Sequence, residues 1–216
     1  MELKILYDNE AKEGFMKGWG FSCLIGDQLL FDTGGNAKSL LFNMNRLDVK
    51  LGKINQIVLS HEHGDHVGGI EILAKLGNVT VIVPKSFPNY FKRRLASYPN
   101  ANIKEVCEAK KISAGFFTTG EIGSSLKEQS LIVRTDNGLL VITGCAHPGL
   151  QNILRTASKL GEIYGLVGGF HSFRRLESLA KLHLIVPCHC TIYKKEILGL
   201  YPGSSRKCSA GCVIDI

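Results

Sequence analysis

The chain has 216 residues, of which 44% are hydrophobic and 21% are charged, and these values are ordinary for a globular protein and exclude a disordered one. The length allows a large core within one domain, which we expect to span residues 1–216. Because no run of about 18 apolar residues exists and the first ten residues lack the apolar core of a signal peptide, we expect a cytoplasmic protein that enters no membrane.

The formal net charge of +7 (26 basic and 19 acidic side chains) predicts a small anionic substrate, such as a phosphorylated or carboxylated molecule. The chain has no dense basic stripe, so we do not expect it to bind nucleic acid. Its seven cysteines are an odd number, which argues against a disulfide framework. Nothing in the composition predicts an oligomeric state.

Apolar runs bounded by turn residues predict strands along the whole chain. They lie near residues 3–7, 21–26, 28–32, 54–59, 79–83, 130–135, 138–143, 163–168, 184–187 and 211–216. Helical periodicity predicts helices near residues 36–46, 68–76, 87–97, 149–160 and 172–181. Asp136-Asn137-Gly138 predicts a hairpin turn. Residues 100–129 show no clear pattern and are interpreted as a loop over the site.

The segment that follows the run at 54–59 is rich in metal-binding side chains. It reads His61-Glu-His63-Gly-Asp65-His66-Val-Gly-Gly. His61 and His63 are two apart on an extended segment and can hold one ion, while Asp65 and His66 turn toward a second. An isolated His-x-His pair is usually accidental, but three histidines and a carboxylate within six residues indicate a metal site.

Three further histidines follow apolar runs, each beside glycine, proline or cysteine. They are His147, His171 and His189. Because histidines at strand ends can converge on one edge of a fold, we expect His147 and His189 to be ligands and His171 to be either a ligand or a proton donor. His183 lies before the last of these strands and is expected to be structural.

The cluster His61-x-His63-x-Asp65-His66, followed by x-Gly-Gly, resembles the signature of the metallo-beta-lactamase superfamily at every position. The resemblance implies an α+β fold, a four-layer αββα sandwich with mixed sheets and a site for one or two divalent metal ions at one edge. It also implies that Asp32, at the end of the strand predicted near residues 28–32, braces the metal-binding loop without touching the metal. An ordinary turn aspartate is the alternative.

Three later motifs resemble one branch of that superfamily. Gly-Cys145-Ala-His147-Pro-Gly, Gly-Gly-Phe-His171 and Pro-x-His189-Cys-Thr, with Tyr7-Asp8-Asn9-Glu10, are similar to the branch that includes the dihydropterin-methyl-ribofuranosylaminobenzene phosphate synthases. The resemblance implies the fold more firmly than the substrate.

The implied ligands form two metal positions. His61, His63 and His147 make one, and Asp65, His66 and His189 make the other. Zinc is the expected metal, with iron, manganese and magnesium as alternatives.

The sequence departs from the superfamily at Cys145. Most binuclear members carry a metal-bridging aspartate after a strand that reads roughly Leu-x-Thr-Gly, and here that position is cysteine. Either Cys145 binds metal as a thiolate, or His147 takes over, or the second position is weak; a small buried hydrophobe is the remaining reading. Cys188 and Cys190 flank His189. Cys208 and Cys212 could hold zinc or form a disulfide, but the closing strand is favoured there.

Three functions fit these residues. In a hydrolase, a metal-activated water attacks the substrate, Asp65 orients it and His171 protonates the leaving group. In a synthase of the dihydropterin type, the metals would instead stabilise departing pyrophosphate. The third is a metal-binding protein without turnover. In either enzyme Arg174 and Arg175 follow His171 closely enough to grip a phosphate.

Overall fold

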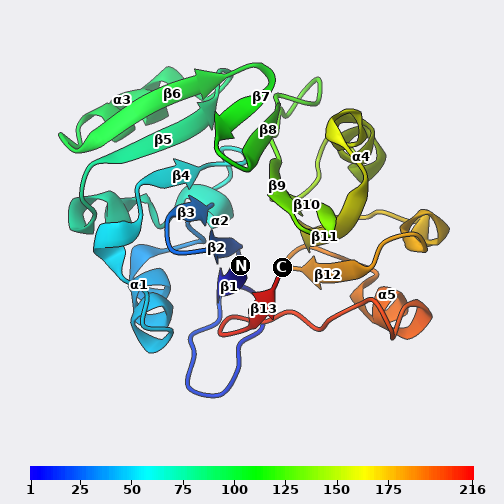
Figure 1. Cartoon of the computed structure of the whole chain (residues 1–216). Helices are drawn as coiled ribbons and strands as arrows, with labels where there is room; N and C mark the ends of the chain where they lie inside the picture. The colour runs from blue at the N-terminus through cyan, green and yellow to red at the C-terminus, as the bar shows by residue number, and fades with distance from the viewer.

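The computed structural model describes all 216 residues and contains two β-sheets that lie face to face (Figure 1). The first sheet has seven strands in the order β13-β1-β2-β3-β4-β5-β6, and the second has six in the order β12-β11-β10-β9-β8-β7. The strands are β1 (Glu2–Tyr7), β2 (Ser22–Ile25), β3 (Leu29–Phe31), β4 (Gln56–Val58), β5 (Val79–Pro84), β6 (Ala101–Val106), β7 (Glu108–Ser113), β8 (Phe116–Gly120), β9 (Leu131–Thr135), β10 (Gly138–Thr143), β11 (Ile163–Gly169), β12 (Leu184–Cys188) and β13 (Val213–Asp215).

Helices cover the outer face of each sheet. They are α1 (Ala37–Arg46), α2 (Gly64–Val67), α3 (Asn89–Ala96), α4 (Leu150–Ala157) and α5 (Lys194–Leu200), with short 3-10 helices at Leu51–Lys53, Ile70–Lys75, Ser158–Leu160 and Leu176–Leu179. The first three α-helices pack on the seven-stranded sheet and the last two on the six-stranded one. No helix combines the length and the apolar character needed to cross a membrane.

Three separate apolar layers hold these elements together, and the alternation of side chains along the strands produces them. On β10, Leu140 and Ile142 point into the layer between the sheets, whereas Leu139 and Val141 point into the layer under α4. The third layer lies between the first sheet and α1 to α3. The expected four-layer αββα sandwich with mixed sheets is therefore confirmed.

Every predicted strand is present, but residues 100–129 are not the loop that the sequence suggested. They form β6, β7 and β8, which extend both sheets at one side. β7 reads Glu-Ala-Lys-Lys-Ile-Ser and no residue in it is fully buried, so it lacks the apolar alternation that identifies a strand. Charged, lysine-rich residues are typical of a strand at the edge of a sheet, where they discourage further pairing.

Two predicted helices are wrong in extent, and one helix was not predicted. The helix expected at 68–76 begins earlier, at Gly64, and continues after Gly68-Gly69 only as the 3-10 helix Ile70–Lys75. The helix expected at 172–181 is reduced to the 3-10 turn Leu176–Leu179, in which a single buried residue, Leu179, gives too little packing for a longer helix. The unpredicted α5 is short and also has one buried residue.

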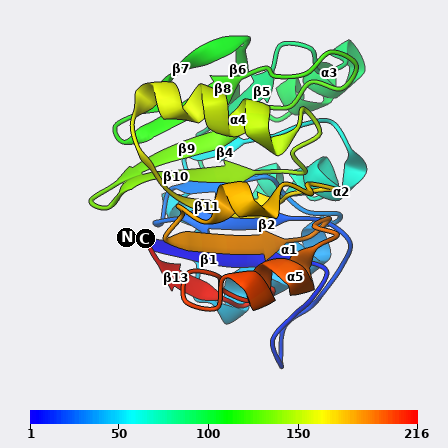
Figure 2. The same cartoon turned by 90° about the vertical axis from the view of Figure 1, so that its right-hand side faces the viewer.

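Strand direction brings the distant histidines to one edge of the molecule. β10, β11 and β12 are mutually parallel, as are β3 and β4, so their carboxyl ends lie together. His61 follows β4, His147 follows β10, His171 follows β11 and His189 follows β12. Figure 2 shows α2 at this edge and both chain termini at the opposite edge.

Candidate metal centre

The first group of potential metal ligands joins the loop after β4 to the loop after β10. One ligand atom each from His61, Cys145 and His147 lies within 4.8 Å of the other two. The ring of His63 lies beside them, with its centroid 4.7 Å from that of His61 and 4.9 Å from that of His147. Four side chains that could bind a soft divalent cation therefore meet at this point.

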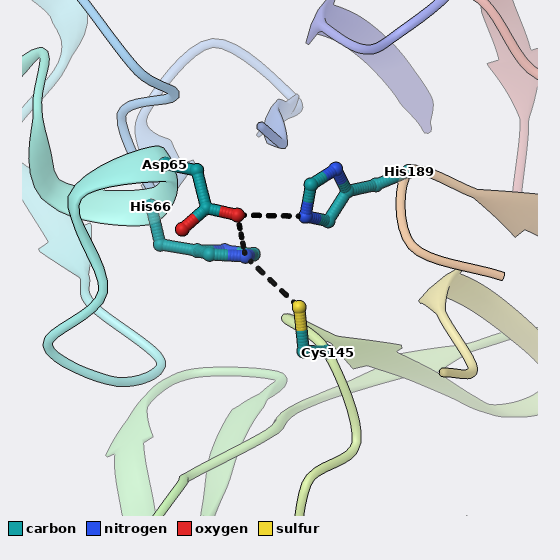
Figure 3. Close-up of side chains that lie close together, drawn as sticks. All are labelled: Asp65, His66, Cys145 and His189. Atoms are coloured by element: carbon teal, nitrogen blue, oxygen red, sulfur yellow. Dashed lines mark hydrogen bonds and ion pairs between the residues drawn. The ribbon is translucent and has the colours of Figure 1, made fainter. Parts of the chain in front are cut away.

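The second group lies beside the first and shares Cys145 with it. Ligand atoms of Asp65, His66, Cys145 and His189 all lie within 4.8 Å of one another. Figure 3 shows these side chains converging from α2, from the loop after β10 and from the end of β12. Cys145 Sγ is 3.2 Å from His66 Nε2, and Asp65 Oδ2 is 3.0 Å from His189 Nε2. Cys145 thus stands between the two groups, where the superfamily pattern has its bridging aspartate.

His171 and the two arginines after it lie next to the first group. The ring centroids of His171 and His147 are 5.1 Å apart, and His171 is exposed. Arg174 and Arg175 line the same cavity as these two histidines. His183 lies apart from this edge and stacks on Tyr164, with 5.7 Å between ring centroids.

Asp32 is not one of the clustered ligands, but it contacts Ser60 and His66 in the segment that carries them. Its Oδ2 is 2.7 Å from His66 Nδ1 and accepts a 2.7 Å hydrogen bond from Ser60 Oγ. Its Oδ1 accepts a hydrogen bond from the backbone N–H of Ser60. Ser60 Oγ is in turn 2.9 Å from His61 Nδ1. These contacts fix two imidazole rings with their Nε2 atoms turned toward the centre.

Glu128 holds the loop that carries Cys145 and His147. Its Oε1 accepts hydrogen bonds from the backbone N–H groups of Gly144, Cys145 and Ala146, and its Oε2 accepts one from His147. Glu128 is 1% exposed, so this loop depends on a buried acceptor. Burial raises the pKa of Glu128, although the loop N–H groups oppose the rise.

The surroundings of three imidazoles of the centre lower their pKa and so favour the neutral form, in which a lone pair is free for a metal. Burial and the neighbouring imidazoles lower the pKa of His61 well below its usual value. Burial, with His63 and His171 beside it, lowers the pKa of His147 to about 4. Burial also lowers the pKa of His189. His66 is the exception, because the Asp32 carboxylate outweighs burial and raises its pKa.

The cysteines near the centre are free thiols. A hydrogen bond with Cys190 and burial raise the pKa of Cys145, so without a cation the thiol keeps its proton. Cys188 is buried between the sheets together with Cys208. Cys212 and Cys208 form no disulfide, and the closing strand predicted beside them is β13.

Backbone strain is concentrated at this edge. Of the five residues other than glycine with a positive φ, four lie at the ends of the strands that carry the centre, namely Asp32 (53°), Ala146 (59°), His171 (48°) and His189 (44°). Such conformations are costly for side-chain-bearing residues and persist where the surroundings enforce them, often at functional sites. Gly144, in the loop after β10, packs closely against Ser60. Only glycine fits there, because a Cβ would overlap Ser60 Oγ.

Two observations indicate that these residues fit a divalent cation. The Nε2 atoms of His61 and His147 are buried and have no hydrogen-bond partner, which is costly for a polar atom unless something else satisfies it. In addition, the Asp65 carboxylate faces His189 Nε2, whose lone pair is unprotonated when the other ring nitrogen carries the proton. A shared cation would stabilise both arrangements.

Sequence reasoning missed the residues that support the ligands. Glu128 lies in the segment that the sequence predicts to be a loop, and nothing near it in the sequence marks it as functional. Asn9 contacts His189 from 180 residues away, and the sequence marks it only as part of the motif Tyr7–Glu10. Trp19 is 65% exposed and lies edge-on to His189, with ring centroids 4.9 Å apart.

The comparisons with known proteins agree with this geometry. The family model described as "Metallo-beta-lactamase superfamily" matches residues 24–157. The chain is 28% identical to the 7,8-dihydropterin-6-methyl-4-(beta-D-ribofuranosyl)-aminobenzene-5'-phosphate synthase of Methanocaldococcus jannaschii, over 80% of this chain and 78% of that protein. It is 30% identical to an uncharacterized protein of the same organism, over 89% of this chain and 91% of that protein.

A solved structure gives the same result. A metal-dependent hydrolase of the beta-lactamase superfamily superposes with a TM-score of 0.83 and 28% identity, covering 100% of this chain and 99% of that one. The matches confirm the resemblance to the superfamily and to the branch that the sequence motifs indicated.

Proposed function

The chain belongs to the metallo-beta-lactamase superfamily, and on this basis we propose that it is a metal-dependent hydrolase of a small anionic molecule. The observation that carries the proposal is the pair of ligand groups that share Cys145 at one edge of the sandwich. The buried, unpartnered Nε2 atoms of His61 and His147 support it, because atoms in that state favour a bound cation.

In this proposal, His61, His63 and His147 would hold one metal ion, and Asp65, His66 and His189 would hold a second. Cys145 is within reach of both groups. A donor set of imidazoles, one carboxylate and one thiol favours zinc, with iron as the next choice and manganese or magnesium less suited. A divalent cation bound here supplies Lewis-acid chemistry and lowers the pKa of water toward neutrality.

The chain's own groups would position and move protons. Asp65 lies at the centre, where its carboxylate can accept a hydrogen bond from an attacking water and orient it. His171 is exposed beside His147 and lines the adjoining cavity, where it can deliver a proton to a leaving group. All seven cysteines are free thiols, which agrees with a cytoplasmic enzyme.

One observation favours a second function, a group transfer that releases pyrophosphate. The observation is the 28% identity to a protein named as a pterin-pathway synthase. In that reaction the same ligand groups would stabilise a departing diphosphate, and an arylamine would replace water as the nucleophile. The exposed Trp19 beside His189 offers an aromatic surface for a planar ring.

The test incubates metal-loaded protein with pterin-methyl diphosphate, with and without an arylamine, and measures pyrophosphate. A panel of phosphodiesters, lactones and thioesters is assayed in parallel. Metal-dependent hydrolysis of a compound in the panel, or pyrophosphate release that does not depend on the amine, supports the hydrolase function. Release that requires the amine supports the transferase. Absence of turnover in every assay, with metal bound, would favour a metal-binding protein without catalysis.

A further inference from the structure

A cavity of about 570 Å³ adjoins the first ligand group, between the start of α4 and the segment after β11. His147 and His171 line it, and so do Arg174 and Arg175. Its volume falls in the range of roughly 300–1,000 Å³ that is typical of small-molecule sites. A molecule held in this cavity would therefore lie directly against the proposed metal centre.

The cavity is electropositive. Its twelve lining residues include two arginines and two histidines but no aspartate or glutamate. Neither arginine takes part in an ion pair within the chain. The guanidinium of Arg174 lies over the ring of Tyr193, 6.0 Å from its centroid, and this contact restricts the conformations of the Arg174 side chain. Two unpaired guanidinium groups in a cavity without carboxylates favour an anion.

The first turn of α4 also lines the cavity and carries backbone hydrogen-bond donors. Gly149, Leu150 and Gln151 line the cavity at the point where this eight-residue helix begins. The residue before the helix is glycine, so no side chain caps the first backbone N–H groups, and the first turn holds no acidic residue. Free N–H groups at a helix start complement an anion that the arginines already attract.

We propose that this cavity binds the phosphate group of a phosphate monoester substrate, a group that the enzyme grips but does not cleave. The proposal deepens the proposed function, on which it rests, by assigning a substrate class. A phosphate dianion has three terminal oxygens and can accept from both guanidinium forks and from the helix start together, whereas a carboxylate has only two. With the phosphate on the arginine side, another bond of the same molecule would lie at His147 and His171.

Calorimetric titration of inorganic phosphate into the zinc-loaded protein tests the assignment without using turnover. Wild type is compared with the double variant Arg174→Gln/Arg175→Gln. Arg93→Gln is the matched control, because Arg93 is an arginine on α3 that lines a different cavity. Acetate is titrated in parallel. Zinc content and melting temperature are recorded for each protein, so that a general loss of structure is recognised.

We expect the double variant to bind phosphate about tenfold or more weakly, since two charge-assisted contacts are lost, while Arg93→Gln binds as wild type does. Unchanged phosphate affinity in the double variant overturns the proposal, as does wild-type protein that binds no phosphate. Acetate binding that is as tight and equally dependent on the arginines overturns the assignment to phosphate. Failure of hydrolysis in the substrate panel would leave these binding results unaffected, so the two proposals fail separately.

Discussion

Asn9 forms two hydrogen bonds with His189 and thereby fixes which ring nitrogen of His189 carries the proton. Asn9 Nδ2 donates to the His189 carbonyl oxygen at 3.0 Å, and Asn9 Oδ1 is 2.9 Å from His189 Nδ1. The backbone N–H of Gly20 also donates to this Oδ1, which identifies it as an oxygen and an acceptor. His189 Nδ1 must therefore donate, and the lone pair of Nε2 is left facing Asp65.

Replacing Asn9 by leucine should weaken metal binding at the second group. The change removes the acceptor for His189 Nδ1, and loss of such a supporting partner typically costs about 10–100-fold in metal affinity. Competition with a chromogenic zinc chelator measures the affinity. Asn78→Ala is the control, because Asn78 is exposed and distant. An unchanged zinc affinity in Asn9→Leu would show that Asn9 does not position His189.

Replacing Glu128 by alanine should destabilise the whole protein. The substitution removes the acceptor of four backbone N–H groups, three of them buried and that of His147 partly buried, and each buried unsatisfied group costs about 1–3 kcal/mol. Glu128→Gln should lose less, because its oxygen can still accept from Gly144, Cys145 and Ala146 while its amide faces the His147 N–H. Urea unfolding gives the free energy of unfolding of each protein, which should be highest in wild type, lower in Glu128→Gln and lowest in Glu128→Ala. Equal stability of the alanine variant and wild type would contradict it.

Changing Cys145 to aspartate should be tolerated and should keep or tighten metal at the second group. The aspartate would place a carboxylate where Cys145 stands between the two ligand groups. Cys145→Ala should instead lose metal, because it provides no ligand atom. Bound zinc per chain is measured after dialysis, with Cys107→Ser as the control at an exposed cysteine. If Cys145→Asp yields no soluble protein, the role of Cys145 is packing alone.

The metal-free protein should lose stability as the pH falls from about 6.5 toward 4. The pKa of His147 is lowered from 6.5 to about 4 in the folded state, so the unfolded chain binds more protons across this window. Stability then rises with pH by less than about 1.4 kcal/mol per pH unit for this group, because His147 is only half-buried. Melting temperatures of chelator-treated wild type and His147→Asn test this, and the variant should show the smaller loss. Identical losses would argue against a lowered pKa.

The sequence predicts the layers of this fold because strand alternation is local. A run such as Leu139 to Ile142 shows from its neighbours alone that both of its faces are buried. The strand β7 could not be found in this way, because it lies at a sheet edge and gets its structure from pairing with β8. The helix predicted at 172–181 is longer than the 3-10 turn Leu176–Leu179 that forms there, for a related reason. Helical periodicity does not reveal how few of these residues the tertiary structure buries.

The same distinction applies to the candidate centre. His61, His63, Asp65 and His66 are visible as a cluster because they are adjacent in the sequence. The convergence of His147 and His189 on them follows once the strands are known to be parallel. Glu128 could not be found from the sequence, because its role is to accept from backbone N–H groups, which carry no residue-specific signal.

The metal content of the purified protein tests the central claim most directly. Plasma emission is applied to wild type, to His61→Ala/His63→Ala and to His183→Ala, after dialysis and with circular dichroism to verify folding. His183 is the control, because it stacks on Tyr164 away from the centre. The account predicts at least one divalent ion per chain in wild type and in His183→Ala, and at least one ion fewer per chain in the double variant. A folded double variant with full metal content would contradict it.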